Sequence, residues 1–222
     1  MTTTKTAAPR HEWLPWAWCN LRRNPFGELS RDERARLAVV NAPELARLVE
    51  NQRHAVQLIG ECGRGKTTRM LALQKYLPDA SYTYLAEDQP CGPIPVGRPI
   101  LIDEAQRLTR RARRAIFCSG LPLVLATHRD LSRPLSRAGY HVTTQWIGQH
   151  ADAEHISQIM NRRIEAARLA NGPVPTLSMQ QADQLVARFG SDIRKMEAFL
   201  YDNVQQQKKT EGMQRGEMRF ID

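Results

Sequence analysis

The sequence predicts an α/β fold, with a parallel sheet between two layers of helices, followed by a smaller all-helical unit. Three observations carry this prediction. Up to about residue 150, short apolar runs of strand length alternate with helical segments, the pattern of a parallel sheet covered on both faces. Beyond that point only helical periodicity remains, as in Ile156, Met160 and Ile164. A glycine-rich stretch, Gly60–Thr67, joins one apolar run to one helix.

The individual elements are predicted in chain order. Ser30 and Glu33 form a capping-box pattern that opens a helix over residues such as Ala35 and Val40. A second short helix begins at Pro43 and ends near Asn51. Strands are expected at 55–59, 81–86, 99–102, 121–126 and 141–147, and helices at 66–77, 109–118, 178–190 and 193–204. A further helix runs through Ile156, Met160 and Ile164 and is stopped by Asn171-Gly172-Pro173. The segment between the second and third strands leaves no room for a full helix.

Composition sets limits on the class of protein. The 222 residues carry 32 Lys and Arg against 23 Asp and Glu, a net charge of +9. No apolar run approaches the roughly 18–20 residues of a membrane span. The four cysteines never occur in a C-x-x-C spacing, which disfavours a zinc ribbon or a disulfide-stapled fold. A reducing, cytoplasmic location is therefore expected, with no membrane association.

The glycine-rich stretch is the strongest functional signal. Gly60-Glu61-Cys62-Gly63-Arg64-Gly65-Lys66-Thr67 matches G-x-x-x-x-G-K-[ST] in full, directly after a predicted strand and at the start of a helix. Backbone N–H groups of such a loop wrap a phosphate chain, and the helix N-terminus adds positive potential. Lys66 is expected to reach the terminal phosphates, and Thr67 to complete a Mg²⁺ shell. The residues expected to bind nucleotide here are Gly60, Gly63, Arg64, Gly65, Lys66, Thr67 and Thr68.

Two acids supply the expected partner of this loop. Asp103 and Glu104 follow the apolar run 99–102, predicted to be a strand beside the first. Asp103 is assigned to the metal and Glu104 to the general base. These motifs do not by themselves distinguish ATP from GTP, although no N-K-x-D guanine reader is present. A protein that binds ATP without hydrolysing it is an alternative, disfavoured by the intact acids.

Two further residues are candidates for sensing the nucleotide. Thr127 ends the predicted strand 121–126, where a polar side chain can reach the γ-phosphate or the attacking water; capping the strand end is the alternative. Arg194 lies in the first turn of the last helix, within Gly190-Ser191-Asp192-Ile193-Arg194. From there it is expected to lean onto the nucleotide, the alternative being an exposed surface arginine.

Together these motifs resemble the AAA+ ATPases. The Asn24-Pro25-Phe26 entry, the string Leu101-Ile102-Asp103-Glu104-Ala105-Gln106 and the turn before Arg194 resemble the branch with the transposition regulators TniB and TnsC and the secretion ATPase ExeA. Origin-recognition ATPases share the last turn. The resemblance implies an ATP–Mg²⁺ site between subunits of a homo-oligomer, with Phe26 bordering the adenine. It also implies an arginine finger, with Arg137 favoured over Arg129 and Arg133. The missing helix between the second and third strands departs from the family and argues against a polypeptide unfoldase.

An arginine-rich segment suggests the macromolecular partner. Arg107, Arg110, Arg111 and Arg114 are expected on one face of the helix that follows the acids, and such a stripe attracts a phosphate backbone. The resulting hypothesis is an ATPase that assembles on DNA and regulates transposition or a related DNA transaction, with a transposase as a possible partner. A solvated or subunit-facing helix is the plainer interpretation of the stripe. The alternative function is a nucleotide-gated protein scaffold that recruits a partner through Trp13, Trp16 and Trp18 without binding DNA. These tryptophans are otherwise expected to pack on the helical lid or a neighbouring subunit.

The expected domains follow from these assignments. They are a Trp-rich N-terminal extension (1–21), an AAA+ nucleotide-binding domain with a three-layer P-loop fold (22–150), a helical lid (151–205) and a flexible tail (206–222).

Overall fold

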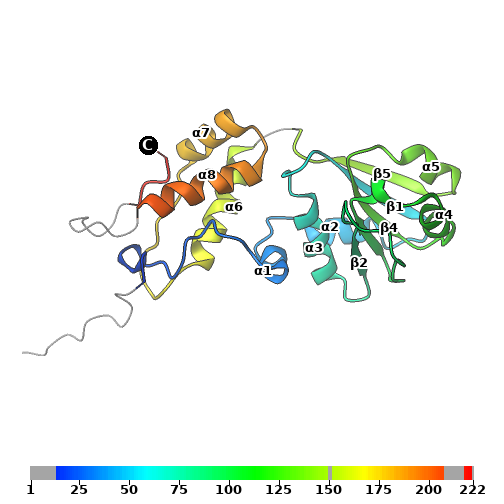
Figure 1. Ribbon diagram of the computed structural model, residues 1–222, viewed down its shortest axis with the longest axis horizontal. Coiled ribbons are helices and arrows are strands. Elements are labelled where there is room, and N and C mark those ends of the chain that lie inside the picture. The colour runs from blue at the N-terminus through cyan, green and yellow to red at the C-terminus, as the bar shows by residue number, and fades with distance from the viewer. Residues whose placement is uncertain (1–13, 150–151, 208–217, 222) are drawn as a thin grey trace, which may run out of the picture. The chain divides into compact units, whose positions relative to one another are not determined.

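The computed structural model describes residues 14–149, 152–207 and 218–221. Its contacts divide into two units, which Figure 1 shows. The α/β unit comprises Leu29–Asp152 and Phe189–Arg194. The helical unit comprises Met1–Glu28, Ala153–Arg188 and Lys195–Asp222. Each unit is described by itself.

The α/β unit is built on a sheet of five parallel strands in the order β2-β3-β4-β1-β5. The strands are β1 (His54–Ile59), β2 (Ser81–Tyr84), β3 (Ile100–Asp103), β4 (Leu123–Thr127) and β5 (His141–Trp146). The parallel sheet and its strand positions confirm the prediction. The prediction that the strand ending in Asp103 lies beside β1 is wrong, because β4 lies between β3 and β1. All five carboxyl ends nevertheless meet at one edge of the sheet.

The two faces of the sheet are buried under different helices. Along β4, Leu123 and Leu125 point into one core and Val124 and Ala126 into the other, because side chains alternate along a strand. The first core packs against α4 (Arg110–Cys118) and α5 (Ser132–Arg137), and the second against α2 (Ala42–Arg47) and α3 (Lys66–Tyr76). This explains why the central strands are apolar on both faces.

The helices lie where the sequence predicts them, but several differ from the prediction in length. Ser30 caps α1 (Arg31–Arg36) with the expected capping box, its Oγ accepting from the Glu33 N–H at 3.2 Å. Both α1 and α2 end earlier than expected. The helix α5 was not predicted, because it is six residues long and contains Pro134. No helix lies between β2 and β3, so the expected departure from the AAA+ pattern is present.

The helical unit contains α6 (Ala153–Ala166), α7 (Met179–Phe189) and α8 (Ile193–Gln206), although the segment 189–194 makes its contacts with the α/β unit. A short 3₁₀ helix, η1 (Ala17–Cys19), precedes them in the chain. Trp16 is buried in this unit and donates its Nε1–H to the Val204 carbonyl at 3.2 Å. Packing on the lid, the plainer expectation for the tryptophans, is thus observed for Trp16, whereas Trp13 lies outside the described residues.

The chain ends correct the expected domain boundaries. Residues 22–28 belong to the helical unit rather than to the nucleotide-binding domain, where Leu21 and Arg168 form an antiparallel bridge. In the segment expected to be a flexible tail, Phe220 is 1% exposed, and its carbonyl accepts from Asn203 at 2.9 Å. An aromatic side chain at this position provides the apolar area that packs the segment 218–221. None of the helices in the described ranges has the length and hydrophobicity needed to span a lipid bilayer.

Candidate nucleotide-binding site

The phosphate loop connects the carboxyl end of β1 to the first turn of α3. Gly65 is the N-cap of α3 with φ +89°, and Gly63 has φ +80°, a left-handed conformation that glycine adopts without a steric cost. The loop therefore turns sharply and leaves the first N–H groups of α3 without intrahelical partners. Thr68 is half-buried in this first turn. A helix of eleven residues gives these N–H groups the positive end of a helix dipole.

Lys66 lies across the loop that it follows. Its Nζ donates to the Gly60 carbonyl at 2.6 Å and to the Glu61 carbonyl at 2.8 Å, and the residue is 5% exposed. Burial lowers the pKa of this ammonium, and the charges of Glu104 and Asp103 partly oppose that shift. Because its hydrogen bonds go to neutral carbonyls, the ammonium keeps its charge available for an anion.

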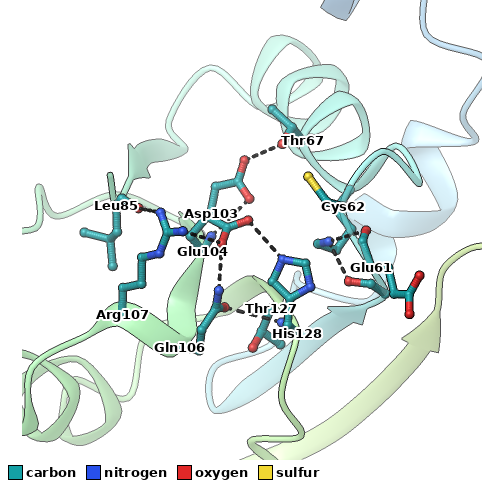
Figure 2. A network of polar contacts seen from close by, with 12 residues as sticks. Glu61, Cys62, Thr67, Leu85, Asp103, Glu104, Gln106, Arg107, Thr127 and His128 are labelled. Carbon is teal, nitrogen blue, oxygen red and sulfur yellow. Dashed lines mark hydrogen bonds and ion pairs between the residues drawn. The ribbon is translucent and has the colours of Figure 1, made fainter. Parts of the chain in front are cut away.

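Thr67 and Asp103 join the loop to the end of β3. The Thr67 Oγ1–H donates to Asp103 Oδ2 at 2.7 Å, and the Tyr82 hydroxyl donates to the same oxygen at 3.1 Å (Figure 2 draws the first of these bonds). Asp103 is fully buried, and desolvation with this carboxylate as neighbour raises the pKa of Tyr82. No Lys, Arg or His in the described ranges forms an ion pair with Asp103.

The donor set at this point fits a magnesium ion. A buried carboxylate without a cationic partner is costly unless a counter-charge is bound. A hydroxyl and a carboxylate are the hard oxygen ligands that Mg²⁺ takes in nucleotide sites, where phosphates and water complete its shell. Thr67 and Asp103, the two residues predicted from the sequence as metal ligands, are therefore suitably placed to hold the ion.

Glu104 follows Asp103 and lies in the left-handed region, with φ +60°. For a residue other than glycine this conformation costs about 1–3 kcal/mol, and it turns the chain from β3 into the 3₁₀ helix η2 (Ala105–Arg107). The carboxylate is 15% exposed and is surrounded by nitrogen donors. These are Gln106 Nε2 at 2.7 Å, His128 Nε2 at 3.5 Å and an Arg107 guanidinium nitrogen at 3.6 Å (Figure 2).

At the end of β4 it is His128, and not Thr127, whose side chain reaches these acids. The Thr127 hydroxyl accepts from the Arg129 N–H at 3.0 Å and donates to the Arg129 carbonyl at 2.9 Å, and the residue is fully buried. Capping of the strand end, the plainer interpretation of Thr127, is what the structure contains. His128 instead faces Glu104.

Two arginines lie at the phosphate loop. Arg194 donates to Cys62 Sγ at 3.2 Å, and the adjoining Asp192 contacts the loop so closely that a Cβ on Gly63 would lie 2.5 Å from its Oδ1. Arg64 pairs with Glu61 at 3.3 Å through Nη2, while its buried Nη1 has no hydrogen-bond partner in the described ranges. The structure thus brings both Arg64 and Arg194, predicted as nucleotide contacts, to the loop.

Phe26 lies elsewhere. It is 4% exposed in the helical unit, where its ring meets Phe220 edge-on at 5.8 Å and the Arg163 guanidinium at 6.0 Å. A ring so fully enclosed has no surface to offer a base. The structure therefore shows Phe26 packing the core of the helical unit, and its place beside the adenine stays an expectation from the sequence.

Arg107 does not share a helix with the other three arginines of the predicted stripe. It belongs to η2, and α4 begins only at Arg110 after the extended N-cap Thr109, so the continuous helical stripe is interrupted. Its guanidinium binds the Leu85 carbonyl at 2.9 Å and Glu87 at 3.0 Å. These contacts hold the Arg107 side chain at the edge of the site. Arg110, Arg111 and Arg114 remain exposed on α4.

Arg137 lies away from the phosphate loop within its own α/β unit. It ends α5, and the next residue, Ala138, accepts from Arg53 at 3.0 Å. Since Arg53 directly precedes β1, this contact marks the amino end of the sheet, whereas the phosphate loop follows the carboxyl end of the same strand. Six residues of strand separate the two ends by about 20 Å.

Three residues of the site were missed in the sequence. Gln106, His128 and Tyr82 all contact Asp103 or Glu104. Gln106 could have been predicted from the sequence, because a residue two positions after Glu104 lies close to Glu104 in any tight turn. Tyr82 and His128 come from other strands, and only the strand order brings them to the acids.

Comparisons with known proteins give structural likenesses only. No protein-family model and no curated protein sequence matches the chain. A RuvB mutant from Thermotoga maritima matches with 18% identity and TM-score 0.46, covering 81% of this chain and 64% of the other. Cdc6p from Pyrobaculum aerophilum matches with 13% identity and TM-score 0.47, covering 86% and 66%. The Drosophila ORC bound to DNA matches with 12% identity and TM-score 0.43, covering 93% of this chain and 64% of the other. The chain spans less than two thirds of the length of each.

At these TM-scores the likeness carries no argument about function, so the fold is assigned from the chain itself. The sheet order β2-β3-β4-β1-β5 is parallel throughout, a complete phosphate-loop motif follows the central β1, and the acidic pair ends β3. The α/β unit therefore has a P-loop fold on a parallel five-stranded sheet, and the helices after residue 152 form a small separate unit.

Proposed function

We propose that this chain is an AAA+ ATPase that binds ATP with Mg²⁺ and hydrolyses it. The observation that carries the proposal is the 2.7 Å contact between Thr67 Oγ1 and the buried Asp103 carboxylate. It joins the phosphate-loop helix to the acidic strand end across an intervening strand, which is where a nucleotide-bound metal is held in P-loop proteins.

The residues of the site have separate roles in this proposal. The N–H groups of the loop and the Lys66 ammonium bind the phosphates, with Lys66 exchanging its carbonyl partners for phosphate oxygens. Thr67 and Asp103 would hold Mg²⁺, which would supply positive charge against the phosphates. Glu104 accepts a proton from the attacking water, and Arg194 and Arg64 add positive charge at the loop.

A steady-state phosphate-release assay tests this proposal. Lys66→Ala is expected to weaken ATP binding and to abolish hydrolysis. Glu104→Gln is expected to bind ATP normally and to lose at least about 100-fold in kcat, the scale of general-base catalysis. Arg36→Ala, at an exposed end of α1, is the control and should match the parent. A Glu104→Gln variant with the parent's rate would contradict the assignment and favour binding without turnover.

The placement of Arg137 supports hydrolysis between subunits. An exposed arginine at the amino end of the sheet cannot serve the phosphate loop at the carboxyl end of its own sheet. In a head-to-tail assembly, however, that end of one subunit meets the nucleotide face of the next. We therefore propose a homo-oligomer in which Arg137 completes the neighbour's site. Arg129 lies two residues after the end of β4, at the nucleotide end of the sheet, so its position does not favour it for this role.

DNA is the proposed macromolecular partner. Arg110, Arg111 and Arg114 are exposed on α4, and none forms an ion pair with a residue in the described ranges. Unpaired arginines on one helix bind phosphates without choice of sequence. The resemblance of the Leu101–Gln106 string to TniB and TnsC supports a role in regulating transposition or a related DNA transaction.

A further inference from the structure

Within the described part of the chain, the Glu104 carboxylate has several nitrogen groups around it but accepts one side-chain hydrogen bond. Gln106 Nε2 donates to Glu104 Oε2 at 2.7 Å. The His128 ring at 3.5 Å faces the other oxygen, Oε1, and the Arg107 guanidinium lies 3.6 Å from Oε2. Both of these distances exceed that of a hydrogen bond between nitrogen and oxygen. The position of the carboxylate is therefore set mainly by Gln106.

The other end of the Gln106 amide is also occupied. Its Oε1 accepts from the backbone N–H of His128 at 3.3 Å, the residue directly after β4. Figure 2 shows the Gln106 side chain extending between Glu104 and the turn at His128. Because the amide donates at one end and accepts at the other, its orientation is fixed, and it ties the turn after β3 to the end of the adjacent β4.

Arg107 does not perform the same task. Its guanidinium is anchored on the Leu85 carbonyl and on Glu87, at the exit of β2. It contributes positive charge near Glu104, but its position is set by these contacts at the edge of the sheet. His128 faces the oxygen that Gln106 leaves free, so the two oxygens of Glu104 have different surroundings.

We propose that Gln106 is the positioning residue for the general base. It holds Glu104 Oε2 and leaves Oε1 to accept the proton of the attacking water. A flexible glutamate in a strained left-handed turn would otherwise sample several rotamers, and misplacement of a reacting group by about 1 Å is costly in rate. This inference rests on the proposed ATPase function. It assigns to Gln106 a contribution to kcat and none to nucleotide binding.

The Gln106→Glu variant separates positioning from a structural tether. The new carboxylate has the size of the amide and still accepts from the His128 N–H, so the connection to β4 is kept. It has no donor for Glu104, and its charge repels the Glu104 carboxylate from its place. Gln52→Glu, an exposed glutamine before β1, makes the same change of charge elsewhere and serves as the matched control.

The experiment measures ATP hydrolysis, affinity for a fluorescent ATP analogue and thermal unfolding in the full chain. Gln106→Glu is expected to lower kcat at least about tenfold, because it removes one hydrogen bond to a charged group. KM, analogue affinity and the melting temperature should stay at parental values. In a Glu104→Gln background the same substitution should cost nothing further, because the base is already absent.

Unchanged kcat in Gln106→Glu, with an active parent, would overturn the assignment of Gln106 alone. The same holds if kcat falls only together with affinity or melting temperature, because Gln106 would then act through the structure of the site. A parent chain that binds the analogue but does not release phosphate would instead overturn the proposed ATPase function, and the positioning role with it.

Discussion

At the scale of single residues, the site consists of two adjacent carboxylates with opposite surroundings. Asp103 is fully buried and meets the hydroxyl groups of Thr67 and Tyr82. Glu104 is partly exposed and faces the nitrogen groups of Gln106, Arg107 and His128. Hydroxyl groups around a buried acid suit a metal ion, whereas the nitrogen groups around Glu104 can hold its carboxylate in one place.

The neighbours Thr127 and His128 provide a test at this scale. Thr127→Val removes both hydrogen bonds to Arg129, so it should lower the free energy of unfolding by about 1–2 kcal/mol. His128→Ala removes the ring that faces Glu104, so it should lower kcat by about tenfold, or about 1.4 kcal/mol in activation free energy. Chemical denaturation and phosphate release measure the two effects. The opposite result, in which Thr127→Val is stable but inactive and His128→Ala retains the parental rate, would restore Thr127 as the sensing residue.

At the scale of elements, α4 separates an apolar face from a basic one. Ile116 and Phe117 are buried against the sheet, while Arg110, Arg111 and Arg114 are exposed. The Thr109 cap begins this helix after Arg107, and its hydroxyl accepts from the Ala112 N–H at 3.2 Å. The basic surface therefore comprises three arginines of one helix, without Arg107.

Charge reversal on α4 tests this surface. The double variant Arg110→Glu, Arg114→Glu is expected to abolish binding to duplex DNA and to leave ATP affinity unchanged. The parent's DNA affinity should fall steeply with salt, because phosphate contacts release counterions. Arg36→Glu with Arg47→Glu, two exposed positions on the other helices, gives the same net charge and should bind DNA as the parent does. Fluorescence anisotropy measures these affinities, and full DNA binding by the α4 variant would exclude α4 as the contact.

The amino ends of β1 and β5 carry a histidine pair with a consequence for stability. The rings of His54 and His141 lie 4.6 Å apart, and His54 Nε2 is 2.9 Å from Thr143 Oγ1. Burial, and then the charge of His141, lower the pKa of His54 below its ordinary 6.5. The unfolded chain therefore binds this proton more tightly than the folded one.

Acid should accordingly weaken the fold through this pair. Its contribution is complete above about pH 6.5 and is lost as the pH falls from there toward the lowered pKa. Thermal unfolding at pH 7.5 and at pH 5.5 should show a smaller decrease in melting temperature for His54→Gln than for the parent. An equal decrease in both proteins would mean that other groups cause the acid sensitivity.

At the scale of the whole molecule, the sequence predicted the order of elements better than their relations in space. The sheet, the phosphate loop and the acids are encoded locally, by apolar runs and by one motif. The insertion of β4 between β1 and β3 is a long-range relation, and it decides that His128 reaches Glu104. The burial of Phe26 against Phe220 joins segments almost two hundred residues apart in sequence, and no local pattern indicates it.

Assembly between subunits provides the prediction at this scale. Arg137→Ala and Lys66→Ala should each be inactive alone. Arg137→Ala lacks the arginine that completes the neighbour's site, and Lys66→Ala does not bind nucleotide. Mixed in equal amounts, they should recover activity, because about a quarter of the interfaces then pair an intact phosphate loop with an intact Arg137. A fully active Arg137→Ala, or a mixture that remains inactive, would exclude Arg137 as the residue supplied by a neighbour.

The central claim is that the phosphate loop and Asp103 together hold one nucleotide with its metal. Isothermal titration calorimetry with a slowly hydrolysed ATP analogue tests it most directly, in the parent, Lys66→Ala and Asp103→Asn, with and without Mg²⁺. The account predicts binding by the parent that tightens with Mg²⁺, little binding by Lys66→Ala, and binding by Asp103→Asn that no longer responds to the metal. Equal binding by the parent and Lys66→Ala, or an undiminished magnesium response in Asp103→Asn, would contradict it.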